Sequence, residues 1–304
     1  MENFVKIILK LTLSIVLLLL QACSSNSLTQ RQINAGVMPQ LIIAEPLAVS
    51  YKSEIALARL SEVIQRADVT DNQRAQFLYD RGVIYDSVGL TSLARIDFSR
   101  ALRLNPKFVD AYNFLGVIYT QIQEFNRAYD AFDSTLDLDP KYEYGYLNRG
   151  IALYYGDRSK LAYQDFMAFY RHQKNDPYRV LWLYLAETRV DPQKALTDLQ
   201  QRLALVDDQV WAKQIIRLYA GELSVGQFIQ HLTKGIKNNN KLTERLCEAY
   251  FYLGKYYLQR QQTSVAANYF KLALSTNVYE FVEHRYARLE LDLMRDKLQG
   301  KVEP

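Results

Sequence analysis

The sequence contains few of the residues that build β-turns, metal centres or strongly charged surfaces. Its 304 residues include seven prolines, 12 glycines and two cysteines, and no alternating strands flank turn residues, which excludes a β-hairpin architecture. The only histidines, His172, His231 and His284, are scattered and lack the paired spacing of a zinc site. The formal net charge is +4, and its dispersed basic residues exclude a dense nucleic-acid-binding stripe.

Motifs for catalysis are also missing. The chain has neither a Gly-x-Ser-x-Gly nucleophile elbow nor a phosphate-binding Gly-x-x-x-x-Gly-Lys-Ser/Thr loop. Glu283-His284 is a suggestive pair, but without a second ligand a helix-packing role is favoured. The sequence predicts a protein that is not an enzyme and holds no metal or cofactor. A carboxylate pair assembled by the fold is the alternative that the sequence leaves open.

Between residues 75 and 169 one residue pattern occurs three times, and its copies are 34 residues apart. Glycines, alanines and phenylalanines recur in the same phase. They are Gly82, Gly116 and Gly150, then Ala94, Ala128 and Ala162, then Phe98, Phe132 and Phe166. Small residues let two helices approach, aromatic residues fill the space between them, and a closing proline, as in Asn105-Pro106, ends the second helix.

This spacing and residue pattern resembles the tetratricopeptide repeat, in which antiparallel helix pairs stack into a solenoid. The resemblance implies an all-α fold, a superhelical solenoid of antiparallel helix pairs that binds partners and seldom catalyses. Clear repeats are predicted at 75–108, 109–142, 143–176 and 247–280. Degenerate helix pairs are predicted at 178–240, and a capping helix at 282–298. The whole solenoid is expected to span 41–304.

Finer expectations concern the ends of single elements. An amphipathic helix is predicted from 49 to about 67, and Thr70 or Asp71 is expected to cap the next helix. Residues 237–240 are expected to form a loop. The apolar residues of 41–47 are expected to pack on the solenoid or on a second copy of the chain.

The N-terminus has the pattern of a targeting segment. Lys6 and Lys10 precede an apolar run that is too short to span a bilayer stably, and Leu20-Gln21-Ala22-Cys23 follows. This tetrapeptide resembles the bacterial lipobox, which implies a lipoprotein signal peptide at 1–22. It also implies a diacylglyceryl group and an N-acyl chain on Cys23, and a flexible tether over 23–40. An ordinary secretory signal with an incidental cysteine is the alternative.

Ser24, in place of aspartate, fits sorting to the outer membrane, with the solenoid facing the periplasm. Lipid on Cys23 leaves Cys247 without a disulfide partner. Because Cys247 lies in an apolar helical pattern, a buried and inert thiol is expected.

The first helix of each repeat is expected to line the concave face of the solenoid. Residues one helical turn apart on those helices would form a mixed apolar, amide and tyrosine surface for an extended peptide or a helix. Those residues are Tyr79, Val83, Asp86, Asn113, Val117, Thr120, Leu147, Ile151 and Tyr154. The alternative is that some of them only pack neighbouring repeats.

Four later segments add a more specific resemblance, at 147–156, 181–187, 251–258 and 281–287. Together with the lipobox they resemble the NlpI-type outer-membrane lipoproteins of Gram-negative bacteria. The resemblance implies a homodimeric adaptor that docks a periplasmic tail-specific protease and presents a peptidoglycan endopeptidase for degradation. It also implies association with other peptidoglycan hydrolases and synthases, and so a role in cell-wall turnover and cell division. The alternative is a lipoprotein that assists assembly of outer-membrane proteins or, like a pilotin, of pili.

Overall fold

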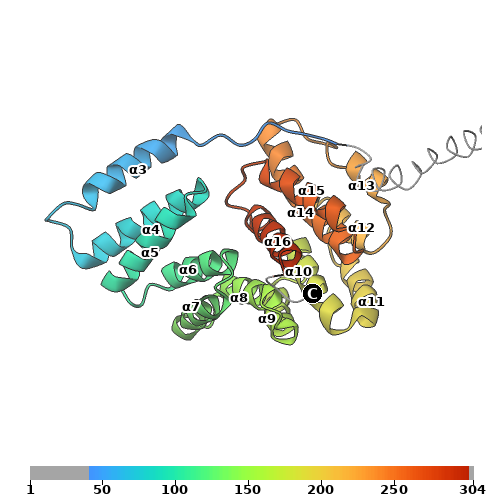
Figure 1. The fold of residues 1–304 in the computed structure, drawn as a ribbon, viewed down its shortest axis with the longest axis horizontal. Helices are drawn as coiled ribbons and strands as arrows, with labels where there is room; N and C mark the ends of the chain where they lie inside the picture. The colour runs from blue at the N-terminus through green and yellow to red at the C-terminus, as the bar shows by residue number, and fades with distance from the viewer. Residues whose placement is uncertain (1–40, 301–304) are drawn as a thin grey trace, which may run out of the picture. The chain divides into compact units, whose positions relative to one another are not determined.

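The computed structural model describes residues 41–300, and residues 42–300 belong to one compact unit. The signal peptide, Cys23 and the tether lie outside the described residues. Residues 41–300 contain fourteen α-helices and no strand (Figure 1). The helices are α3 Tyr51–Val63, α4 Asp71–Ser87, α5 Thr91–Leu104, α6 Val109–Gln121, α7 Phe125–Leu138, α8 Glu143–Tyr155, α9 Ser159–His172, α10 Pro177–Val190, α11 Pro192–Leu203, α12 Lys213–Tyr219, α13 Val225–Gln230, α14 Asn239–Gln259, α15 Thr263–Leu274 and α16 Val282–Leu298.

Consecutive helices pack as pairs, which gives the all-α solenoid that the repeat pattern predicts. Within each clear pair, a glycine of the first helix faces a phenylalanine of the second. A Cβ atom added to Gly116 would lie 2.5 Å from Cε1 of Phe132. The same contact recurs at 2.7 Å for Gly82 and Phe98, 2.8 Å for Gly150 and Phe166, and 2.5 Å for Gly254 and Phe270. Glycine therefore allows the two helices of a pair to approach each other.

Polar caps and prolines determine where several helices start. Thr70 caps α4 in a capping box with Gln73, as expected from the sequence. Asp176 and Asp191 accept hydrogen bonds from the first turns of α10 and α11, each of which has proline at its start.

Two expectations about helix ends are wrong. The first helix ends at Val63, short of residue 67, because the Arg74 guanidinium donates hydrogen bonds to the carbonyls of Ile64, Arg66 and Val69. These bonds hold the chain in a turn after Ile64. The expected loop at 237–240 is shorter than predicted, since Asn238 caps a helix that begins at Asn239.

The apolar segment before α3 lies on the C-terminal repeat. Ile42 and the hydroxyl of Tyr250 exchange hydrogen bonds, and the amide of Leu47 donates to the carbonyl of Thr276 at 2.9 Å. Of the two alternatives for 41–47, the structure has this segment packed on its own solenoid.

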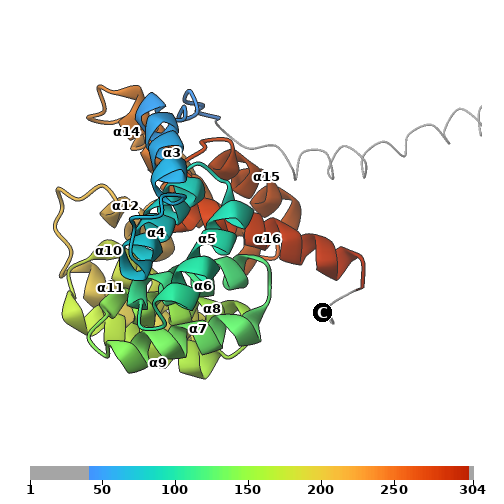
Figure 2. The same cartoon turned by 90° about the vertical axis from the view of Figure 1, so that its left-hand side faces the viewer.

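The last helix, α16, does more than close the end of the stack. It packs on α15 and α14 and also reaches the first helices of the three N-terminal repeats (Figures 1 and 2). Arg285 of α16 pairs with Asp86 of α4 at 2.6 Å. Asp296 accepts a hydrogen bond from Gln123 at 3.0 Å, and Glu290 accepts one from Tyr155 at 2.8 Å. The helix predicted at 282–298 has these bounds in the structure, and in addition it contacts the inner side of the N-terminal repeats.

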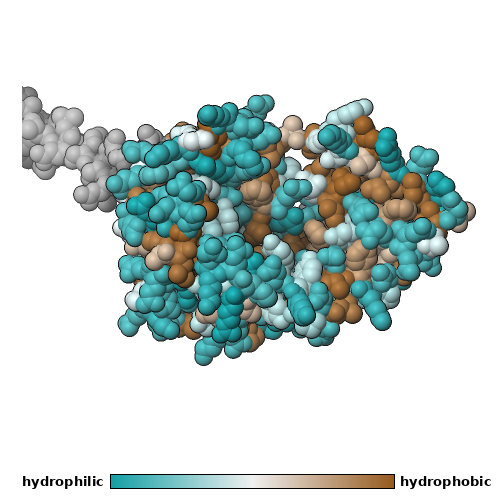
Figure 3. Space-filling model, turned by 180° about the vertical axis from the view of Figure 1, so that it is seen from behind, coloured by the Kyte–Doolittle hydropathy of each residue, from teal (hydrophilic) through white to brown (hydrophobic). Residues whose placement is uncertain are grey.

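Some apolar side chains remain at the surface. Leu93 and Ile96 of α5 are exposed, and Figure 3 shows apolar areas and a central hollow on the side opposite the view of Figure 1. Among residues 41–300, no helix is long and apolar enough to cross a bilayer.

Candidate functional site

Most of the side chains predicted to line the concave face lie inside the protein. Tyr79 and Val83 are half-buried. The other seven are buried: Asp86, Asn113, Val117, Thr120, Leu147, Ile151 and Tyr154.

Several of the buried seven already have partners within the chain. Asp86 pairs with Arg285, although burial outweighs this cation and raises the pKa of Asp86 above its usual value. Asn113 accepts a hydrogen bond from the amide of Asn148 at 3.0 Å. The hydroxyl of Thr120 donates to the carbonyl of Gly116, at 2.8 Å.

Tyr79 belongs to a half-buried aromatic cluster. Its ring centroid lies 4.7 Å from that of Phe108, 5.8 Å from that of Phe98 and 5.9 Å from that of Phe114. Burial, with Asp110 and Asp80 nearby, raises the pKa of Tyr79 to about 12. The nine predicted residues therefore do not form one open surface in this structure, and their contact with a partner stays a prediction.

A polar cluster joins the third repeat to the C-terminal helices. Nζ of Lys255 lies 3.0 Å from the hydroxyl of Tyr154 and is paired with Glu290 of α16. Lys255 and Glu290 are only 2% and 3% exposed. The cluster is structural, because every charged group in it is satisfied within the chain.

An open cavity of about 300 Å³ lies where α8 to α10 meet α14 and α16. Of the nine predicted residues, only Leu147 lines it. The full lining is Tyr144, Leu147, Phe169, Asp176, Tyr178, Arg179, Trp182, Glu248, Glu280, Phe281, Val282 and Glu283. Tyr144 and Glu280 are exposed at its rim, whereas Trp182 and Glu283 are buried. The volume reaches the lower end of the range for ligand sites.

Two carboxyl groups in this cavity are held away from water. Glu248 accepts a hydrogen bond from the indole of Trp211 at 2.6 Å, and burial raises its pKa to about 6. Glu283 is 6% exposed; burial and then the charge of Glu248 raise its pKa to about 8. This is the carboxylate pair that the sequence leaves open, and its two residues come from different helices, α14 and α16.

Arg179 provides the cation of the same cavity and is 5% exposed. Its Nη1 donates to the carbonyl of Phe169 at 2.6 Å, and its Nη2 to Glu143 at 3.0 Å. Its Nε is buried without a hydrogen-bond acceptor. This N–H is therefore a buried donor without an acceptor on the wall of the cavity, and Oδ2 of Asp176 lies 4.0 Å from Nε. Arg179 and Glu248 were not predicted from the sequence. The only nearby signal was the segment at 181–187, which follows Arg179 on α10.

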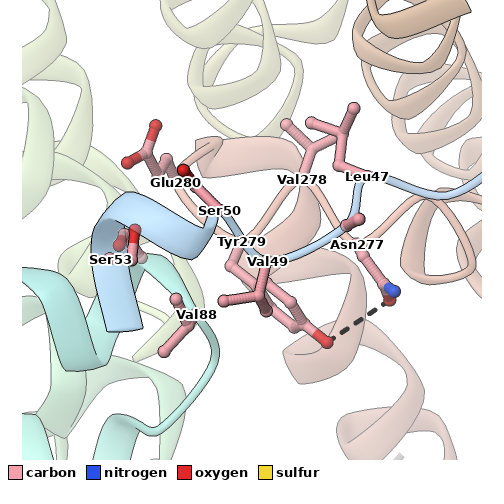
Figure 4. A pocket seen from close by; sticks show the side chains of 11 residues that line it. Leu47, Val49, Ser50, Ser53, Val88, Asn277, Val278, Tyr279 and Glu280 are labelled. Carbon is pink, nitrogen blue, oxygen red and sulfur yellow. Dashed lines mark hydrogen bonds between the residues drawn. The ribbon is translucent and has the colours of Figure 1, made fainter. Parts of the chain in front are cut away.

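Two other cavities are less suitable as sites. One of about 160 Å³ lies between the start of α3, the α4–α5 turn and the segment before α16 (Figure 4). It is below the usual size of a ligand site. Another, of about 380 Å³, adjoins the C-terminal half of α16. Most of its charged groups are already paired: Arg189 with Asp157, and Glu290 with Lys255.

His284 and Cys247 fit structural roles. Burial lowers the pKa of His284 to about 4, and its Nε2 lies 3.1 Å from the carbonyl of Leu274. Cys247 is buried, and burial raises the pKa of its thiol well above the usual value. In the part of the chain that the structure describes, no group of three or more His, Cys, Asp or Glu residues could hold a metal ion.

A family model of the tetratricopeptide repeat matches residues 75–108 and 109–142. These residues are two tetratricopeptide repeats. They correspond to the helix pairs α4–α5 and α6–α7. Tetratricopeptide repeats generally bind protein partners on extended surfaces and typically serve as non-catalytic scaffolds. The prediction that the chain is not an enzyme stays a prediction.

Solved structures with helical repeats resemble the chain at low identity. A tetratricopeptide repeat protein from Parabacteroides merdae is 17% identical, with a TM-score of 0.49, over 80% of this chain and 91% of that one. Pseudomonas aeruginosa pilF is 19% identical, with a TM-score of 0.43, over 71% and 97%. MamA is 19% identical, with a TM-score of 0.46, over 50% and 88%.

Proposed function

We propose that the protein is an adaptor that binds a tail-specific protease and cell-wall hydrolases. In this role it promotes proteolysis of a peptidoglycan endopeptidase, and so controls cell-wall turnover and cell division. The observation that supports binding is the pair of tandem tetratricopeptide repeats at 75–142. The identity of the partners rests on the resemblance of the later segments to NlpI-type lipoproteins.

The mechanism of such an adaptor is proximity. A protease and its substrate that meet weakly in solution are brought to a high effective concentration when both bind one scaffold. The stacked helix pairs, tied together by α16, provide the rigid frame that this mechanism requires. A homodimer, as the resemblance implies, would double the number of docking sites on one assembly.

The location that we propose is the outer membrane, with lipid on Cys23 and the solenoid in the periplasm. More than one acyl chain is needed for stable anchoring, and a diacylglyceryl group plus an N-acyl chain meets that need.

Cys23→Ala should therefore move the protein from the membrane fraction to the soluble fraction, while the far-ultraviolet circular dichroism of the purified protein stays that of the wild type. Cys247→Ala, which removes the other cysteine, serves as control and should stay with the membrane. Membrane retention of Cys23→Ala would contradict the anchor.

The adaptor function is tested by following the loss of a purified peptidoglycan endopeptidase in the presence of the protease. Adding the full chain, in detergent micelles, should accelerate this loss at least about tenfold, as expected for a gain in effective concentration. Val83→Lys on the predicted concave face should reduce the acceleration. Leu196→Lys places the same charge on an exposed site of α11 and should leave it unchanged. Equal loss with and without the chain would refute the adaptor.

A further inference from the structure

The cavity between α10, α14 and α16 holds two carboxyl groups that have no ion pair among residues 41–300. Among residues 41–300, Glu283 forms no ion pair with lysine, arginine or histidine, although it is 94% buried. Glu248 interacts with the indole of Trp211, the hydroxyl of Tyr178 and the charge of Arg245, and forms no ion pair among these residues. Buried carboxylates normally have a cationic partner, because an unpaired buried charge is strongly disfavoured. Without a ligand a proton on Glu283 removes this cost, and a cation from outside the chain can take the place of that proton.

The walls of the cavity fit a cation on an aliphatic stem. Tyr144, Phe169, Tyr178, Trp182 and Phe281 provide aromatic surface between the rim and the carboxyls. Aromatic rings bind the methylene groups of a long basic side chain and attract its charged head through their faces. Tyr144, which is 54% exposed, lies at the rim where such a side chain would enter.

The unpaired Nε–H donor of Arg179 indicates what kind of molecule carries the cation. Each of its two Nη groups donates one hydrogen bond within the chain, and its buried Nε–H has no acceptor. A carboxylate prefers to bind the guanidinium through two parallel hydrogen bonds, whereas a peptide carbonyl needs one donor. One N–H donor is sufficient for the backbone carbonyl of a peptide, which a basic side chain in the cavity brings with it.

We propose that this cavity binds a lysine or arginine side chain of an extended partner peptide. Glu283 and Glu248 receive its charged head, the aromatic walls hold its stem, and Arg179 Nε donates to a backbone carbonyl of the peptide. This deepens the proposed function, because it specifies which kind of segment the adaptor recognises.

Binding of a cation at this place is coupled to proton release. Without a ligand, burial keeps the pKa of Glu283 near 8, so this carboxyl holds a proton at neutral pH. An ammonium beside it favours the ionised form, so the peptide and the proton compete. The other charged or titratable groups around Glu283 and Glu248 are Asp176 at the N-cap of α10, Tyr178 and Arg179 from α10, Glu244, Arg245, Cys247 and Tyr252 from α14, and Glu280 from the loop before α16.

The test uses the full chain in detergent micelles and a fluorescein-labelled, C-amidated pentapeptide with one central lysine between alanines. Fluorescence anisotropy should show binding that weakens about tenfold or more when norleucine replaces the lysine. Between pH 6.5 and 8.5 the affinity for the lysine peptide should rise about tenfold or more, since Glu283 loses its proton over this range. The amine n-butylamine should compete far more weakly than the unlabelled peptide, because it has no carbonyl for Arg179.

Two variants locate the binding. Glu283→Gln imitates the protonated carboxyl, so the protein should stay folded, bind the lysine peptide about tenfold more weakly and lose the pH dependence. Tyr144→Ala, at the exposed rim, should also weaken binding without unfolding the chain. Glu62→Gln removes a charge from an exposed site on α3 and should bind like the wild type.

Equal affinity for the lysine and norleucine peptides, unchanged binding by Glu283→Gln, or n-butylamine as strong as the peptide would each overturn the proposal. Failure of this test leaves the adaptor function intact if the chain still accelerates endopeptidase loss. A chain that binds the peptide but does not accelerate that loss would retain the cavity assignment and refute the adaptor.

Discussion

Lys255→Met should lower the free energy of unfolding by about 3–5 kcal/mol, the usual cost of breaking a buried ion pair by removing one partner. Lys255 is 2% exposed, and its ammonium group contacts Glu290 and the hydroxyl of Tyr154. Methionine can occupy the same apolar path but leaves Glu290 buried without its cation. Equilibrium urea denaturation followed by circular dichroism measures the loss.

A second substitution separates the unpaired charge from a loss of packing. The double variant Lys255→Met/Glu290→Gln has no buried charge at this place and should recover most of the lost stability. The deficit of the single variant should also shrink as the pH falls. An unpaired buried carboxylate is costly, and lower pH favours the neutral form of such a group, so the cost falls. A deficit that is the same at pH 5 and pH 8 would contradict the assignment.

Gly116→Leu should destabilise the protein by about 3 kcal/mol or more, at the upper end of overpacking effects. Even a Cβ atom at this position would lie 2.5 Å from the ring of Phe132, which is fully buried. The ring has no space to move away, so α6 and α7 must separate. The melting temperature, followed by circular dichroism, should fall accordingly.

Two comparisons make this result specific. Gly226→Leu inserts the same side chain where no heavy atom lies within 4 Å, and should change stability by less than about 0.5 kcal/mol. Gly116→Leu/Phe132→Ala removes the ring that clashes, so its loss should be smaller than the sum of the two single losses. Additive losses in the double variant would show that Gly116 does not define this helix contact.

The contact between Gly116 and Phe132 could be predicted from sequence because both residues belong to one helix pair. They are sixteen positions apart in every copy of the pattern, so a local antiparallel turn brings them together. Helix starts were predictable for the same reason: the Thr70 cap involves only Gln73, three residues later. The end of α3 could not be predicted in this way. The side chain that ends it, Arg74, belongs to the following helix, α4.

The cavity and the placement of α16 depend on contacts over much longer separations. Asp86 meets Arg285, and Tyr155 meets Glu290, only after every intervening helix pair has added its rotation to the stack. The degenerate pairs at 178–240 have no regular pattern from which that rotation could be read. The buried state of Asp86, which the sequence analysis expected to face a groove, follows from this path of α16.

The sequence by itself determined the tetratricopeptide pattern, the all-α solenoid and the close helix contact within each pair, because the interactions that specify them are local and repeat. Only the tertiary structure decided that α16 contacts the inner side of the N-terminal repeats and that Glu248, Glu283 and Arg179 meet in one cavity. The physical reason is that small rotations between successive pairs accumulate along the chain, and their sum determines which distant side chains come into contact.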